Sequence, residues 1–207
     1  MNKYNYLSII LILVSFIFSI YDTFIYPRKN KYDDYFPEHK DKSLFKKIIW
    51  YLSQFTYQKQ LIFLFYFYLK FKNYKNLERF LKIIAPPMMI INLFYFKYLF
   101  PNYTKQCSEK NYKLYELSFY DIFPHLLDTF IIILELSSLS SYKFNDIHLP
   151  IYFQLMMLIS VIINYKIRKV WSYNIVDLKQ KSTYKMLIEF LIYNYIVAYV
   201  IYKIKKK

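Results

Sequence analysis

The apolar residues of this chain gather into six long blocks, and most of its charged residues lie between the blocks. The first block is nearly unbroken from Ile9 to Ile20, where Ser15 and Ser19 are the only polar members. A helix needs about 20 apolar residues to span the hydrocarbon core of a bilayer, with about 17 as the lower limit. Six such blocks are hard to bury in a water-soluble chain of 207 residues.

This pattern predicts an all-α, polytopic membrane protein. We expect a single transmembrane domain over residues 1–207, with about six transmembrane helices near residues 6–25, 48–69, 80–100, 119–139, 149–165 and 186–202. The alternative is a soluble all-helical protein, but blocks one, five and six lack the periodic polar face of a soluble helix. A β-barrel would need alternating strands of about ten residues, whereas these blocks are continuous. Bulky residues rather than a small-residue cleavage site follow the first block, so we expect a retained span and not a signal peptide.

The composition excludes several classes of site. The chain has no glycine, so it contains no phosphate-binding glycine loop, no dinucleotide fingerprint and no Gly-x-Ser-x-Gly nucleophile elbow. Without glycine for a strained turn, we expect a nucleophile to lie on a continuous helix. The single cysteine, Cys107, allows no internal disulfide and no cysteine zinc cluster. Lys, Asn and Ile are encoded by codons rich in A and T and are abundant here, so we attribute part of the formal charge of +15 to nucleotide bias. No nucleic-acid-binding motif accompanies this charge, so we expect no nucleic-acid partner. We also expect no cofactor.

The loops give conflicting signals about orientation. Those after predicted spans one, three and five hold sixteen Lys and Arg residues, against ten on the opposite side, which places both termini outside by the positive-inside rule. In contrast, Asn102-Tyr103-Thr104 is a glycosylation acceptor that requires a lumenal loop after span three. The ending Lys203–Lys207 resembles a dilysine retrieval signal, which is read from the cytosol. We expect cytosolic termini.

The predicted fourth span carries the densest set of ionisable residues. Ionisable groups at membrane depth are costly, so each is a functional candidate. Asp121, Asp128 and Glu135 are seven residues apart and form one helical stripe. His125 and Thr129 lie on the same face of the helix.

The predicted second span carries a matching polar face. Ser53, Thr56 and Gln60 recur at three- and four-residue steps, and Lys59 beside them is placed to pair with a carboxylate of the fourth span. A hydroxyl needs a base to become a good nucleophile, and neutral imidazole suits that task near neutral pH. The two spans therefore contain the parts of a nucleophile–base pair.

The same residues admit other interpretations. Ser and Thr in membrane helices often hydrogen-bond to the backbone or to a neighbouring helix. A metal site on the fourth span would have only one histidine, so we expect no metal. The carboxylate stripe Asp121, Asp128 and Glu135 is also compatible with a non-catalytic transporter or channel, where it would line a cation or proton path.

Three short motifs resemble those of a known family. Trp50-Tyr51-Leu52-Ser53, with Gln60 seven residues after the serine, resembles the second-span motif of the androgen-induced gene 1 and androgen-dependent TFPI-regulating protein family, which reads aromatic-Leu-Thr with Gln seven positions on. The stretch His125–Glu135 is similar to the family's segment around its catalytic His, with the same ten-residue spacing. Trp171-Ser172-Tyr173 resembles the family's Trp-x-Tyr-Pro element, although Asn174 replaces the proline.

The resemblance implies a six-span endoplasmic-reticulum protein, a multispan membrane threonine hydrolase that cleaves fatty acid esters of hydroxy fatty acids. It places the nucleophile at Ser53, where the family has Thr, and the base at His125. Residues and resemblance together predict an intramembrane hydrolase of lipid esters, with the bilayer and a lipid ester as its partners. Ser53 is the expected nucleophile with Thr56 as the alternate, and Asp121 or Asp128 is expected to orient His125.

Overall fold

The computed structural model describes residues 3–21, 24, 43–101, 105, 123–169, 171 and 177–206. Every element within these residues is helical, which confirms the predicted all-α class for this part of the chain. The elements in order are α1 (Lys3–Ile20), α3 (Leu44–Ser53), α4 (Phe55–Phe71), α5 (Leu77–Phe94), the π-helix η3 (Tyr95–Leu99), α8 (Phe123–Ser137), the short 3₁₀-helix η5 (Phe144–His148), α9 (Pro150–Arg168) and α10 (Lys181–Lys205).

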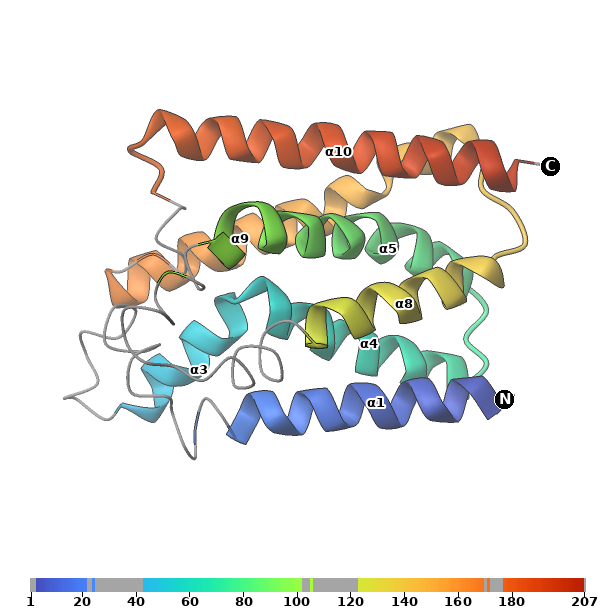
Figure 1. Cartoon of the computed structure of the whole chain (residues 1–207), viewed down its shortest axis with the longest axis horizontal. Helices are drawn as coiled ribbons and strands as arrows, with labels where there is room; N and C mark the ends of the chain where they lie inside the picture. Colours follow the sequence, from blue (N-terminus) through green and yellow to red (C-terminus); the bar gives the residue numbers. More distant parts are fainter. Residues whose placement is uncertain are drawn as a thin grey trace.

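The long helices run back and forth along the longest axis of the molecule (Figure 1). Helix α5 lies at the centre and packs against α4, α8, α9 and α10, while α1 packs against α4 and α8. The beginning of α1 and the end of α10 lie at the same end of the bundle (Figure 1). A chain that enters and leaves at one end crosses the bundle an even number of times.

Three stretches of the described residues are long and apolar enough to cross a membrane: Leu77–Tyr98, Phe144–Arg168 and Lys181–Lys205. At 1.5 Å per residue they are about 33 to 37 Å long, enough for a hydrocarbon core of about 30 Å. They correspond to the third, fifth and sixth predicted spans. The apolar part of α1, Tyr6–Phe18, is shorter, so the structure suggests a membrane protein with three candidate spans rather than the six expected.

Helix α5 continues through Pro86 and Pro87, which are both buried within it. Each proline removes one backbone hydrogen bond of the helix, a loss that membrane helices tolerate when their neighbours are close. Directly after α5 the backbone widens into η3, which begins at Tyr95. Such π-helical segments often occur at functional sites.

The predicted second span is interrupted at Gln54, so the expectation of one continuous helix over residues 48–69 is wrong. Gln54 has φ −83° and ψ 123°, an extended conformation between α3 and α4. This negative φ needs no glycine. Ser53 is consequently the last residue of α3, whereas Thr56 lies in the first turn of α4.

Side chains and carbonyls around Gln54 stabilise this break. The Gln58 Nε2 donates to the carbonyl oxygen of Leu52 at 2.5 Å and thereby satisfies an acceptor at the end of α3. The carbonyl oxygen of Gln54 accepts the backbone N–H groups of Tyr57 and Gln58, at 3.1 and 3.0 Å. Because both ends are capped in this way, the chain can stop one helix and begin the next within one residue.

The core between the helices is rich in aromatic and aliphatic side chains. Its fully or almost fully buried members include Phe63 of α4, Met88 of α5, Ile131 of α8 and Met157 of α9. Polar contacts also join the helices, as expected for a chain that lacks glycine for close packing: Gln60 of α4, for example, donates to Ser15 of α1 at 2.7 Å.

Candidate active site

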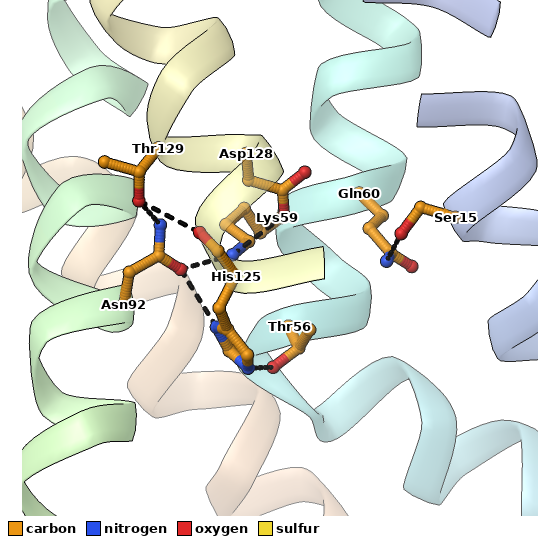
Figure 2. Close-up of polar contacts among 8 residues, drawn as sticks. All are labelled: Ser15, Thr56, Lys59, Gln60, Asn92, His125, Asp128 and Thr129. Atoms are coloured by element: carbon orange, nitrogen blue, oxygen red, sulfur yellow. Dashed lines mark hydrogen bonds and ion pairs between the residues drawn. The ribbon is translucent and has the colours of Figure 1, made fainter. Parts of the chain in front are cut away.

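Thr56 and His125 meet where the first turn of α4 faces the beginning of α8 (Figure 2). The Thr56 Oγ1 atom lies 3.3 Å from the Nε2 atom of His125. This is a long hydrogen bond, of the kind that catalytic pairs often show without substrate. His125 is buried and Thr56 is half-buried, so the pair is largely shielded from the surroundings.

The structure does not bring Ser53 to this pair. The Ser53 hydroxyl donates to the carbonyl oxygen of Trp50 in its own helix, at 2.7 Å, and the residue is 1% exposed. The prediction placed Ser53, Thr56 and Gln60 on one helical face, but that face is interrupted at Gln54. Geometry therefore favours Thr56, the alternate nucleophile of the sequence analysis, over Ser53.

The other ring nitrogen of His125 faces an asparagine rather than an acid. The His125 Nδ1 atom is 2.9 Å from the Oδ1 atom of Asn92, a buried residue of α5. Asp128, which the sequence placed behind the imidazole, instead lies 2.8 Å from the ammonium group of Lys59. The expected direct role of Asp128 in orienting His125 is therefore corrected, and Asp121 lies outside the described residues.

Lys59 connects the acid to the asparagine. Its Nζ atom is 2.8 Å from the Asp128 carboxylate and donates to Asn92 Oδ1 at 2.5 Å. Lys59 and Asp128 are both 0% exposed. The expectation that Lys59 pairs with a carboxylate of the fourth predicted span is confirmed. Removal of one partner from a buried ion pair leaves an uncompensated charge, so we expect loss of either Lys59 or Asp128 alone to destabilise the fold.

Three further contacts hold Asn92 and His125 in place. The Asn92 amide nitrogen donates to the Thr129 hydroxyl, and that hydroxyl donates to the carbonyl oxygen of His125 at 3.0 Å (Figure 2). The ring of Tyr95, the first residue of η3, stacks on the ring of His125, with the centroids 3.8 Å apart and the planes 15° apart. Asn92 thus contacts the imidazole at its Nδ1 edge, and Tyr95 covers one face of the ring.

Thr56 and His125 lie on the wall of a cavity of about 240 Å³. The remaining lining is almost entirely apolar and comes mainly from α5, α9 and α10: Phe55, Ile91, Phe94, Tyr95, Ile151, Gln154, Leu155, Met157, Leu158, Val161, Met186, Leu187, Phe190 and Leu191. The polar side chains that reach it are therefore few. A cavity of this kind suits an apolar ligand with one reactive polar group.

No family model, curated protein sequence or solved structure matches this chain. The function proposed below therefore rests on the residues around this cavity and on the motifs of the sequence.

The structure also locates the other residues that the sequence singled out. Gln60 is turned toward Ser15 and away from Thr56 (Figure 2). Glu135 accepts from the Tyr66 hydroxyl and from Lys70, both at 2.6 Å, two helical turns away from Asp128. Among the described residues, no group of three or more His, Cys, Asp or Glu side chains could hold a metal ion.

Sequence reasoning did not identify Asn92 or Tyr95 as parts of the site. Asn92 has a visible signal, because it is the single polar residue in the run from Ile83 to Phe94. A lone amide at membrane depth needs a partner, which marks it as a candidate. Tyr95 has no such signal, since the chain contains 26 tyrosines and only the packing of η3 on α8 selects this one.

Proposed function

We propose that this protein is a membrane-embedded hydrolase of lipid esters, with Thr56 as its nucleophile and His125 as its base. The observation that carries the proposal is the 3.3 Å approach of Thr56 Oγ1 to His125 Nε2 on the wall of an apolar cavity of about 240 Å³. The resemblance of the sequence to the androgen-induced gene 1 family supports an ester as the substrate. It suggests fatty acid esters of hydroxy fatty acids as the substrate class.

The reaction follows the pattern of other hydroxyl nucleophiles. The lone pair on His125 Nε2 takes the proton of the Thr56 hydroxyl while Oγ1 attacks the acyl carbonyl carbon. The resulting imidazolium then gives this proton to the oxygen of the leaving alcohol as the ester bond breaks. Water, activated by the same nitrogen, attacks the acyl-threonine and releases the fatty acid with Thr56 restored.

The break at Gln54 offers a way to stabilise the oxyanion of the tetrahedral intermediate. The N–H groups of Tyr57 and Gln58 donate to Gln54, and the carbonyl of Leu52, one turn before Thr56, accepts from Gln58. This leaves the Thr56 N–H at the positive end of α4, next to its own hydroxyl. Backbone N–H groups at such positions are effective oxyanion donors.

The position of the cavity favours access from the bilayer. Leu155 of α9 and Leu191 of α10 line the cavity and are 49% and 37% exposed. Both helices are candidate membrane spans with apolar outer faces. An acyl chain can therefore pass between α9 and α10 without crossing water, and the low dielectric inside strengthens the polar contacts of the site.

The same proposal extends to topology and location. We propose six crossings, made by α1, α3 with α4, α5, α8, α9 and α10. The beginning of α1 and the end of α10 lie at the same end of the bundle, which supports an even number of crossings with both ends on one side of the membrane (Figure 1). The family resemblance favours the endoplasmic reticulum or another endomembrane, with the termini in the cytosol.

The transporter alternative has less support from the described residues. Asp128 forms an ion pair with Lys59, and Glu135 forms one with Lys70. Neither carboxylate lines the cavity. A transporter would lose flux in liposomes when Asp128 is neutralised and would keep it in Thr56→Ala.

Hydrolysis of branched lipid esters by membranes that contain the protein tests the proposal. We expect Thr56→Ala and His125→Ala to lower the rate by about 10²- to 10⁴-fold, the range of general acid–base catalysis. Ser53→Ala removes a hydroxyl that donates to the Trp50 carbonyl of its own helix, so this variant is the matched control and should remain active. Full activity of Thr56→Ala would reject Thr56 as the nucleophile.

A further inference from the structure

Asn92 contacts Lys59 and His125 with the same atom. Its Oδ1 accepts from the Lys59 ammonium at 2.5 Å and lies 2.9 Å from the Nδ1 of His125. An ammonium group has donors only, so the atom that faces it has to be the carbonyl oxygen of the amide. The orientation of the Asn92 amide is therefore determined by Lys59.

This orientation determines which nitrogen of His125 carries the hydrogen. A carbonyl oxygen only accepts, so Nδ1 has to donate to Asn92. A neutral imidazole has one N–H group, which leaves a lone pair on Nε2. Nε2 is the atom that faces Thr56 Oγ1. The donor and the acceptor of each hydrogen bond are thus fixed along the series Lys59, Asn92, His125 and Thr56. In this arrangement Nε2 presents its lone pair to the Thr56 hydroxyl, as a base must.

The opposite side of the amide reinforces this arrangement. The Asn92 Nδ2 atom donates to the Thr129 hydroxyl, which in turn donates to the carbonyl oxygen of His125. A flipped amide would direct an N–H donor at the Lys59 ammonium and lose that hydrogen bond, and its carbonyl oxygen would face a Thr129 hydroxyl whose hydrogen is already donated to His125. The network therefore has a single consistent orientation.

Asp128 compensates the charge of Lys59, so the ammonium can orient Asn92 in the interior of the protein. The two side chains are both 0% exposed and form a pair of zero net charge at 2.8 Å. Without the carboxylate, the ammonium would be an uncompensated buried charge close to the site where an imidazolium forms. The neutral pair orients Asn92 without placing a net charge next to His125.

We propose that Lys59, paired with Asp128, is a positioning residue that sets the tautomer of His125 through Asn92. The inference rests on the proposed function for its catalytic meaning, since a lone pair on Nε2 serves as a base only beside Thr56. The tautomer itself is a property of the resting protein and can be measured without any substrate.

Magnetic resonance of the full chain with isotope-labelled histidine in detergent micelles reads this tautomer directly. The chain has three histidines, so the spectrum of His125→Gln identifies the signal of His125. We expect neutral His125 to carry its hydrogen on Nδ1. In Asn92→Leu, and in the double variant Lys59→Met/Asp128→Leu, we expect this preference to be lost.

The Lys70–Glu135 pair provides a matched control, because it joins the same two helices at 2.6 Å. Lys70→Met/Glu135→Leu should leave the tautomer of His125 unchanged. The double variants remove both charges and so avoid the unpaired charge that could prevent a single variant from folding. A wild-type hydrogen on Nε2, or an unchanged tautomer in Lys59→Met/Asp128→Leu, would overturn the inference.

The two proposals fail in different ways. If the hydrogen of His125 is on Nδ1 but the protein cleaves no ester, only the proposed function is rejected. If the protein is an active hydrolase and the tautomer does not respond to Lys59, only the positioning role is rejected. Where both hold, ester hydrolysis by Asn92→Leu should fall by about 10²- to 10⁴-fold through kcat, because the base would present the wrong tautomer.

Discussion

The Oγ1 atom of Thr56 lies 3.3 Å from the Nε2 atom of His125, although the two residues are 69 positions apart in the sequence. Each residue lies in the first turn of its helix as the structure describes it, Thr56 in α4 and His125 in α8. Helix α5 packs against both helices and contributes Asn92, which contacts the far side of the imidazole. The pair therefore depends on three helices and on the break at Gln54.

The nature of the side chain at position 56 tests this relationship. Thr56→Ser keeps the hydroxyl beside His125, so we expect lipid-ester hydrolysis within about tenfold of wild type, whereas Thr56→Ala should lose it. Hydrolysis by the purified variants in micelles, at matched protein concentration, makes the comparison. Equal loss in both variants would show that position 56 supports the structure and not the chemistry.

The shape of the cavity predicts selectivity for the acyl chain. Val161 is 1% exposed and lines the cavity, so Val161→Phe should fill part of it. We expect hydrolysis of long-chain esters to fall at least about tenfold relative to a short-chain ester, because only the long chain needs the filled volume. Ile84→Phe is the control, since Ile84 is equally buried and does not line the cavity. An equal effect of both substitutions on both substrates would contradict the assignment of the cavity.

The Lys59–Asp128 pair predicts a pattern in stability. Asp128→Asn leaves the Lys59 ammonium buried without its counterion, which typically costs about 3–5 kcal/mol. Lys59→Met/Asp128→Leu removes both charges and should be close to wild type, because replacing a buried pair with apolar residues is often neutral. Thermal unfolding in a single detergent measures both variants. A double variant that is less stable than the single variant would mean that the pair contributes more than charge compensation.

Orientation can be tested by glycosylation mapping. With six crossings and cytosolic termini, acceptor sites added to either end should stay unmodified, and Asn102 should receive a glycan. Digestion with an endoglycosidase then shifts the wild-type band and leaves that of Asn102→Gln unchanged. A glycan on one added terminus but not on the other would require an odd number of crossings.

Much of the fold follows from short-range patterns in the sequence. Long apolar blocks predicted the positions of α5, α9 and α10, because helix length and apolar content are local properties. Residue spacing likewise predicted that Lys59 would meet a carboxylate of α8 and that His125 would face α4. These predictions need only helical periodicity and the cost of burying an unpaired charge.

The remaining features depend on packing between distant segments. The break at Gln54 is stabilised by the side chain of Gln58, which caps Leu52 and also donates to Ser160 of α9 at 2.5 Å. Nothing in the apolar pattern marks such a break. The resemblance to the androgen-induced gene 1 family placed the nucleophile at Ser53, and the sequence offered no reason to prefer Thr56. Asn92 takes the place expected of Asp128 as the partner of His125 because α5 packs against both α4 and α8.

Covalent labelling with a fluorophosphonate, followed by mass spectrometry of the labelled peptide, tests the central claim most directly. We expect the phosphonyl group on Thr56, with labelling lost in Thr56→Ala and in His125→Ala and retained in Ser53→Ala. Labelling of Ser53, or of neither hydroxyl in protein that is shown to be folded, would contradict the assignment of Thr56 and His125 as nucleophile and base.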